Sequence, residues 1–552
     1  MESFLQYRRI RQAAARELAV GEVEEKCNCD GEHVSSCKLG KLTVPQVRPA
    51  LRSPEDSSDG RTTVSNFNVN WSGPDDDLNP ANFSVARKAF MTALVSLIGV
   101  SVTAASAIDA CGIVEYTEEF KTSEVVGSLR TGSSLELFNW AILTLPGLFL
   151  IGFAFGSLLS GPFSETFGRN AVYIVTMLLF LLFIMAAALA PNLPSHLVFR
   201  FIAGFFGSTP LTCSGGTVAD LWDPVQKAYA FLIYAIPAFG GPVIGQLIGS
   251  FIPSTLGWRW LEWIMLIMGG AVLVAVVLLQ PETYGGLLLQ WKASAFRKHT
   301  GDQRYKAPME MRTESLQRRL AIAVYRPFAW SYSEPIIILM SLYLTVIYII
   351  LFTFLEGYKY IFGQTYGLSQ GLTSITWSGM LVGMILVCLI VPVVYSWTRD
   401  EYERTSRIRP ETRLWYAMLG GAPAVPISLF WMGWTAYVNF LIFVPSISIF
   451  SPIVASALFG YGITTIFISA YLYIIDSYGV YSASALGFMA FSRYLVSGGV
   501  TVAGGPIYER YGFHYTLTVL GAISTLMAVI PYLLYFYGLT IRKMSQHALI
   551  KD

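Results

Sequence analysis

Charged side chains inside apolar stretches are the residues best suited to chemistry in this sequence. Arg200 lies in Phe199-Arg200-Phe201 and is followed by Gly204 and Gly207. An arginine inside a membrane span costs about 2.5–3.5 kcal/mol on insertion scales, so we expect it to face a bundle interior, a partner or water. There it would set the charge balance of a cavity. The alternative is an arginine near a span end whose guanidinium extends to the membrane surface.

Arg493 lies well inside a second apolar stretch and is the next candidate for a cavity or proton-coupling residue. Asp109, Glu262, Glu356 and Lys359 lie near the ends of apolar stretches, where water solvates a charge at little cost. We expect smaller roles for these four, and only Asp109 is kept with the two arginines as a candidate for proton coupling. The sequence does not identify the acid that carries the proton.

A polar turn combines glycines with a possible ion pair in Gly161-Pro-Phe-Ser-Glu165-Thr-Phe-Gly168-Arg169. The glycines allow a tight turn to pack against a neighbouring helix. The acid and the arginine can pair, or cap helix ends, in a contact that breaks and re-forms during a working cycle. The alternative is a surface turn with a charge pair.

Gly241, Pro242, Gly245 and Gly249 form a small-residue face in one apolar stretch. Glycines at every fourth position let another helix approach closely, and the proline removes a backbone hydrogen bond and permits bending. A dimerisation face would look similar.

Aromatic residues are candidates for a substrate cavity at Tyr234, Tyr343, Tyr348 and Phe352. Such rings can bind flat or cationic organic molecules. They also fill membrane cores and interfaces, and for any single ring that interpretation is favoured.

Enzymes and ATP-driven pumps receive no support from the sequence. It contains no phosphate-binding loop of the type Gly-x-x-x-x-Gly-Lys-Ser/Thr. Its five histidines fall in tails, loops or helix ends, and Cys27, Cys29, Cys37 and His33 fit no standard zinc-finger spacing. We therefore predict no catalytic residue, no metal and no cofactor.

Composition indicates a membrane protein that positions these residues on transmembrane helices. Over the 552 residues 54% are apolar and only 13% are charged, against about a quarter charged in soluble domains. A span needs about 20 apolar residues. That length predicts six spans near 88–109, 138–159, 171–190, 196–218, 228–252 and 260–280, and six more near 335–355, 373–397, 414–435, 446–474, 484–507 and 514–537.

Loop charges orient the chain and divide it into five parts. Lysines and arginines are concentrated in 281–334 and 398–413, which we expect on the cytosolic side, whereas the loop after the first span is acidic. Both termini are then cytosolic. The predicted parts are a disordered tail 1–87, a bundle 88–280, a central loop 281–334 with an amphipathic helix on the inner membrane surface, a bundle 335–537 and a tail 538–552.

The two halves resemble each other, as in transporters built from repeats. In the first half Ala219-Asp220-Leu221-Trp222 precedes the span that carries Gly240, Gly241 and Gly245. In the second half Ile475-Asp476-Ser477-Tyr478 precedes Gly498, Gly499, Gly504 and Gly505 at nearly the same distance. Asp220 and Asp476 are therefore candidates for a cytosolic gate.

The motifs together resemble the major facilitator superfamily, and within it the fungal twelve-span drug:proton antiporters. The turn from Gly161 to Arg169 resembles the superfamily signature, with Glu165 where Asp is more frequent, and the Gly241-Pro242 pattern resembles the antiporter motif of exporters. Shorter matches extend from Trp71 to the last helix, and are Trp71-Ser-Gly-Pro, Gly215-Gly-Thr-Val-Ala-Asp220, Gly257-Trp-Arg259-Trp260, Pro281-Glu-Thr-Tyr284, Pro410-Glu-Thr-Arg413 and Tyr473-Ile-Ile-Asp476.

This resemblance implies an all-α polytopic membrane protein with the major facilitator fold, in which two pseudo-symmetric six-helix bundles rock about a central cavity. It implies a proton-driven exporter of small organic molecules such as drugs, fungicides, toxins or secondary metabolites, monomeric, without nucleic-acid partners and resident in the plasma membrane. The alternative is a proton-coupled importer or a nutrient sensor that no longer transports. Segments 130–144 and 438–445 look like extra residues relative to the family pattern, and we interpret them as either loop elaborations or gene-prediction errors such as retained intron sequence.

Overall fold

The computed structural model is helical throughout the membrane-forming part of the chain. It describes residues 1–29, 67–112, 115–116, 119, 145–311, 315–435, 448–479, 482–545 and 547–548. The long segments 130–144 and 438–445 lie outside these residues.

The first half of the bundle contains six long helices, as the apolar stretches predict. They are α2 (Val85–Ile108), α5 (Leu145–Phe167), α6 (Arg169–Ala188), α7 (Leu193–Leu221), α8 (Lys227–Gly249) and α10 (Arg259–Leu279), with the short η2 (Asp109–Gly112) after α2 and α9 (Ile252–Leu256) before α10. Polar side chains begin two of them: Ser84 accepts from the Arg87 amide, and Asn192 accepts from the Ser195 amide.

The second half is more segmented. Its elements are α13 (Pro335–Tyr358), η3 (Lys359–Thr365), α14 (Gln370–Ile375), α15 (Ser378–Leu386), η4 (Val387–Leu389), α16 (Val391–Thr405), η5 (Pro410–Leu414), η6 (Ala417–Gly421), α17 (Ala422–Thr435), α18 (Phe450–Tyr478), α19 (Ser482–Met527) and α20 (Val529–Met544). Proline lies at the start of α13, α16 and η5, where its missing N–H has no helical partner to lose.

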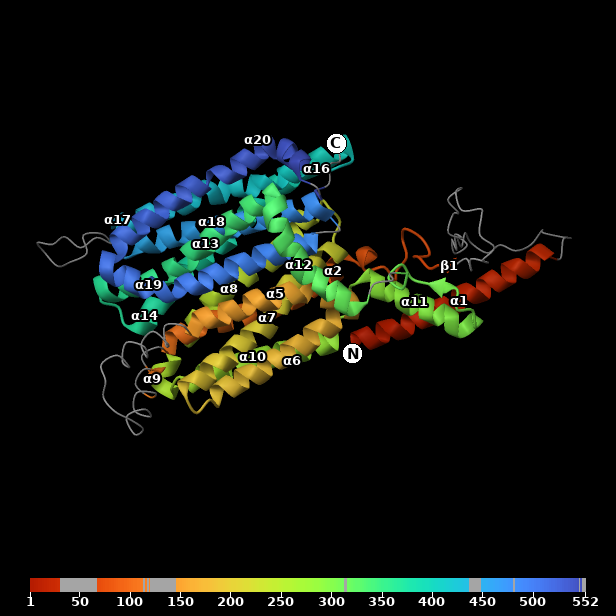
Figure 1. Ribbon diagram of the computed structural model, residues 1–552, viewed down its shortest axis with the longest axis horizontal. Helices are drawn as coiled ribbons and strands as arrows, with labels where there is room; N and C mark the ends of the chain where they lie inside the picture. The colour runs from red at the N-terminus through yellow and green to blue at the C-terminus, as the bar shows by residue number, and fades with distance from the viewer. Residues whose placement is uncertain are drawn as a thin grey trace, which may run out of the picture.

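Eleven helical stretches of the described chain are long and apolar enough to cross a membrane, six in the first half and five in the second. They correspond to eleven of the twelve predicted spans. The remaining predicted span, 484–507, is helical but belongs to α19, which bends at Gly512 (φ 74°) and continues into the last span. In Figure 1 the helices of the two halves run side by side along the long axis of the molecule.

A small unit projects from one end of the bundle (Figure 1). It contains α1 (Glu2–Cys29), the paired strands β1 (Phe67–Asn68) and β2 (Tyr305–Lys306), and α11 (Gly285–Thr300); η1 (Pro80–Asn82) follows β1 and α12 (Leu316–Ser333) follows β2. We call this end of the bundle the α11 end and the opposite end the α9 end. Residues 2–29 form α1 and residues 67–68 pair with β2, whereas the composition of 1–87 predicts a disordered tail.

Contacts with α1 explain both this order and the position of α11. Ala14 of α1, Leu289, Ala293 and Phe296 of α11 and Val69 form one buried cluster. The apolar face of α11 is therefore covered by the chain's own N-terminal segment, and not by a membrane surface as the amphipathic pattern predicts. Lys292 on the same helix is buried, with its ammonium 3.1 Å from Glu17 and donating to Ser72 at 2.7 Å.

Candidate functional site

Arg200 lies between two carboxylates near the α9 end of the first half. Its guanidinium is 2.7 Å from Asp109 and 3.3 Å from Glu262, and all three side chains are fully buried. The same guanidinium donates to the Ala105 carbonyl at 2.5 Å. The position inside the bundle agrees with the interpretation that Arg200 faces its interior, and not with an arginine at the membrane surface.

His196 extends this cluster by one turn of α7. Its Nδ1 is 3.0 Å from the Ala187 carbonyl, which can only accept a hydrogen bond, so Nδ1 carries the proton. In the neutral ring Nε2 is then an acceptor, and it lies 3.9 Å from an oxygen of Glu262. Two acceptors face each other here, which is favourable only when one of them holds a proton.

The sequence underestimates Glu262. It lies in the first turn of α10, and its position near a span end suggests easy solvation, yet the structure buries it completely. The reason is that the start of α10, the start of α7 and the end of α2 meet at this point. The tertiary meeting of these three ends has no signal in a single sequence.

A metal ion is a weaker interpretation of the same cluster. Oxygens of Asp109 and Glu262 and a nitrogen of His196 lie within 4.8 Å of one another, a separation that could suit a metal. The guanidinium of Arg200 already lies against both carboxylates, and a second cation would be repelled at that distance.

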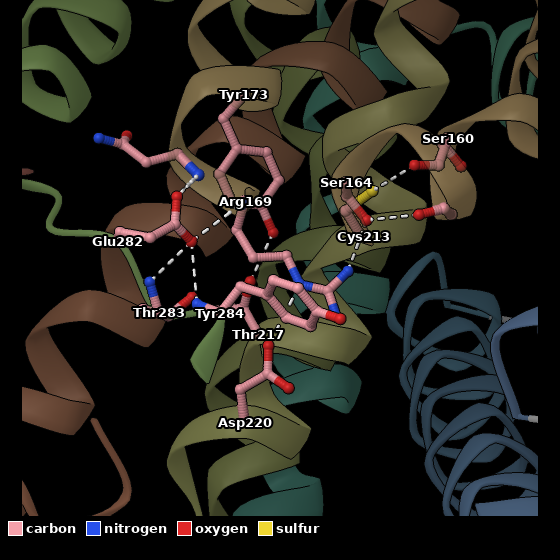
Figure 2. A network of polar contacts seen from close by, with 12 residues as sticks. Ser160, Ser164, Arg169, Tyr173, Cys213, Thr217, Asp220, Glu282, Thr283 and Tyr284 are labelled. Atoms are coloured by element: carbon pink, nitrogen blue, oxygen red, sulfur yellow. Dashed lines mark hydrogen bonds and ion pairs between the residues drawn. The ribbon is translucent and has the colours of Figure 1, made fainter. Parts of the chain in front are cut away.

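Arg169 organises a second polar network at the α11 end (Figure 2). It begins α6, its Nε is 3.2 Å from Asp220 at the end of α7, and its Nη1 donates to Ser164 at 2.6 Å. The acid that pairs with Arg169 is therefore Asp220, whereas Glu165 lies beside them in the lining of a cavity.

Glu282 completes this network and was not among the residues predicted from the sequence. Its carboxylate accepts from the Arg169 amide at 2.9 Å and the Asn170 amide at 3.2 Å, and so caps the start of α6. Burial raises the pKa of Glu282, and the backbone N–H donors around it oppose that shift. Gly168 has φ 90°, and a Cβ there would collide with the Glu282 carboxylate, which explains the glycine before Arg169. The sequence signal that could have identified Glu282 is the motif Pro281-Glu-Thr-Tyr284.

N-terminal residues hold Glu282 from the other side. The Gln6 amide donates to the Glu282 carbonyl at 3.0 Å and accepts from the Glu282 amide at 2.8 Å. The helix α1 is thus connected by two hydrogen bonds to the residue that caps α6.

The second half has a counterpart of the Arg169–Asp220 pair. Arg413 in η5 is buried, with Nε 2.7 Å from Asp476 near the end of α18. Its Nη2 also donates to the Pro224 carbonyl of the first half at 2.7 Å. Asp220 and Asp476 lie at corresponding places in the two halves of the sequence, and each forms an ion pair with an arginine at the α11 end. Arg413 of the second pair also connects the two halves through its hydrogen bond to Pro224.

The glycine face of α8 packs on α2. A Cβ on Gly241 would overlap the Thr103 hydroxyl, one on Gly245 would overlap the Ala104 carbonyl, and one on Gly249 would lie 2.9 Å from Ile108. The face therefore makes a contact inside the first half, which accounts for its small residues without a second copy of the chain.

The described residues of the two halves enclose a row of cavities, three of which bear on the site. The cavity at the α9 end has about 320 Å³ and is lined by residues that include Cys111, Gln246, Glu356 and Lys359. The central cavity has about 30 Å³, and that at the α11 end about 230 Å³. A hydrogen bond joins the halves at each end: Gln370 donates to the Cys111 carbonyl at the α9 end, and Arg413 donates to the Pro224 carbonyl at the α11 end.

Two of the four predicted aromatic residues line these cavities. Tyr348 and Phe352 line the central cavity together with Pro242 and Arg493. Tyr234 is buried and donates to the Leu211 carbonyl at 2.8 Å, and Tyr343 is buried elsewhere on α13; neither lines the three cavities.

Comparisons with known proteins agree with this architecture. The family pattern described as Major Facilitator Superfamily matches residues 85–502. The MFS-type transporter kojT of Aspergillus flavus is 43% identical over 513 residues, which cover 92% of this chain and 86% of kojT. The citrinin biosynthesis cluster MFS transporter mrr1 of Monascus ruber is 33% identical, with 89% and 94% covered. A partially occluded inward-open structure of the xylose transporter XylE from E. coli, 14% identical, shares the fold with a TM-score of 0.54 over 81% of this chain and 97% of its own.

Proposed function

The chain belongs to the Major Facilitator Superfamily and is a multi-pass membrane transporter, and from this premise we propose that it exports a small organic molecule in exchange for protons. The observation that carries the proposal is Arg200, fully buried between Asp109 and Glu262. The cluster contains the elements of a reversible proton site.

Charge balance is the physical argument for that site. With both acids ionised the cluster carries one uncompensated negative charge, and an unpaired charge in a buried site costs several kcal/mol. Taking up one proton makes the cluster neutral. His196 Nε2, an acceptor, lies 3.9 Å from Glu262, so Glu262 is the acid proposed to carry the proton, while Asp109 remains paired with Arg200 at 2.7 Å.

The transport cycle is alternating access. We assign the α11 end to the cytosol, because the basic loops lie there, which also places both termini in the cytosol. Export requires the Arg413–Pro224 bridge to open for substrate entry, and the Gln370–Cys111 contact to open for release and protonation. The Arg169–Asp220 and Arg413–Asp476 pairs act as inner latches. No cofactor is needed beyond the proton gradient.

The names of the relatives narrow the substrate class. One is a citrinin biosynthesis cluster transporter and another an ascochitine biosynthesis cluster transporter, 32% identical. By extension we propose that this chain exports a secondary metabolite or a related toxic compound across the plasma membrane, as a monomer.

The test is accumulation of toxic organic compounds in yeast that lack their own exporters. Cells with the wild-type chain should accumulate less of at least one compound, and a protonophore should abolish the difference. Glu262→Gln should abolish it too at equal surface expression, whereas Arg399→Ala, which changes an exposed arginine, should not. Higher accumulation than in control cells would indicate an importer, and no change would overturn the proposal for that panel.

A further inference from the structure

Arg493 is a buried arginine on α19. Among the described residues no ion pair joins it to a carboxylate, and aromatic rings lie against its guanidinium instead. Its Nη2 donates to the Tyr494 hydroxyl at 3.2 Å, and the Tyr471 side chain is a second hydrogen-bonding neighbour of the guanidinium. Nε and Nη1 have no hydrogen-bond partner at ordinary geometry among the described residues. Unsatisfied charged donors in a buried site are costly, so their presence here requires a reason.

Aromatic rings surround the guanidinium instead of acids. Its carbon lies 4.6 Å from the ring centre of Tyr494, 4.7 Å from Tyr348, 5.3 Å from Tyr471 and 5.4 Å from Phe467. Cation–π contacts with these rings attract the guanidinium and keep the charge in place. They do not satisfy the N–H donors, which need an oxygen or nitrogen acceptor.

The donors are placed where a substrate must pass. Arg493 lines the central cavity with Thr103, Ser106 and Phe239 of the first half and Phe352 of the second. A volume of about 30 Å³ is the share of one water molecule, so an organic molecule fits only when the halves move apart. A site shared by both halves is the one that alternating access opens to each side in turn.

We propose that Arg493 binds the acidic group of the transported molecule, and that the substrate is a flat organic acid. Its carboxylate or enolate oxygen accepts from the Nε–H and Nη1–H groups of the guanidinium, and its ring system lies against Tyr348 and Phe467, which line the same cavity. This rests on the proposed function and deepens it by naming the substrate class. A cationic drug is excluded, because like charges repel strongly in a buried site.

Binding to the purified full-length protein tests the inference separately from transport. The probes are matched pairs that differ only in charge: salicylate with salicylamide, and 2-naphthoate with 2-naphthamide. Wild-type protein should bind at least one acid ten times more tightly than its amide. Arg493→Gln should reduce that ratio below about twofold. Arg493→Lys keeps the charge but loses the planar donor set, so it should still prefer the acid but bind it more weakly than the wild type does. This variant also provides the test if Arg493→Gln does not fold.

The outcomes separate the two proposals. If no flat acid binds the wild-type protein more tightly than its amide, or if the folded Arg493→Gln variant keeps the full preference, the role of Arg493 is overturned. If acids bind through Arg493 but their efflux from cells is unaffected by a protonophore, the binding site stands and proton-driven export fails. If protonophore-sensitive export acts on amides or cations and not on acids, export stands and the acid site fails.

Discussion

Arg200 and Arg493 are both buried in this bundle, with opposite electrostatic surroundings. Arg200 has an excess of acid around it, which is the basis for proposing that its cluster exchanges a proton. Arg493 has unsatisfied donors among aromatic rings, which is the basis for proposing that it binds an anion. In these proposals the proton site belongs to the first half of the chain, and the arginine that binds the substrate belongs to the second half, in a cavity that both halves line.

Removal of Arg200 should destabilise the protein more than removal of either acid. Arg200→Ala leaves two buried carboxyls without a cation, and breaking a buried pair in this way costs about 3–5 kcal/mol. The triple variant Arg200→Ala, Asp109→Asn, Glu262→Gln should recover part of the loss, because no charge is left unpaired. Thermal unfolding in detergent measures both, and equal loss in the single and triple variants would contradict the electrostatic explanation.

At the residue scale, the sequence identifies charged residues inside apolar stretches but does not identify the residues that contact them. Arg200 and Arg493 are recognisable because each interrupts an apolar stretch. Glu262 and Glu282 are not, because each lies at a span end where a charge is usually solvated, and only the packed structure shows that both are buried.

At the scale of elements, the glycine motif of α8 predicts a close helix–helix contact, and the structure shows it between α8 and α2. Gly245→Ala would place a methyl group against the Ala104 carbonyl, whereas Gly270→Ala on α10 meets nothing within 4 Å. We expect the first to lower the free energy of unfolding by about 1–3 kcal/mol and the second to leave it nearly unchanged. Denaturation of the matched pair measures the difference, and equal effects would contradict close packing as the reason for the glycine.

Docking of α1 should control the mobility of the latch at the α11 end. Gln6→Ala removes both hydrogen bonds to Glu282, so amide hydrogen exchange should rise in residues 280–284 and at the start of α6. Arg9→Ala is the control, since Arg9 is exposed and pairs only with Glu2 on its own helix. Unchanged exchange in Gln6→Ala would show that α1 does not support Glu282.

The sequence predicts the membrane helices far better than it predicts α1. Apolar stretches of sufficient length identify each span without knowledge of its neighbours. The polar N-terminal segment is instead stabilised by α11, hundreds of residues away, and by a buried Lys292 whose partner Glu17 lies on α1. Composition alone therefore suggests disorder.

At the scale of the whole molecule, two native cysteines can report the alternation between ends. Cys111 lines the cavity at the α9 end and Cys213 that at the α11 end. Arg413→Ala removes the bridge to Pro224, so labelling of Cys213 by a thiol reagent should become several times faster and that of Cys111 slower. The other cysteines are first changed to serine: Cys27, Cys29, Cys37 and Cys388.

The control for this labelling experiment is Arg399→Ala, which should change neither rate. Rates that rise together at both cysteines would indicate general loosening of the bundle and would contradict alternating access.

The hydrogen bonds between Gln6 and Glu282 also constrain the order of folding during synthesis of the chain. The two residues are 276 positions apart, and at about 5–20 residues per second the ribosome needs about 14–55 seconds to go from one to the other. During that time α1 is complete, but Glu282 and α11, against which it docks, have not been synthesised. The docking of α1 on Glu282 thus follows the synthesis of the first six membrane helices.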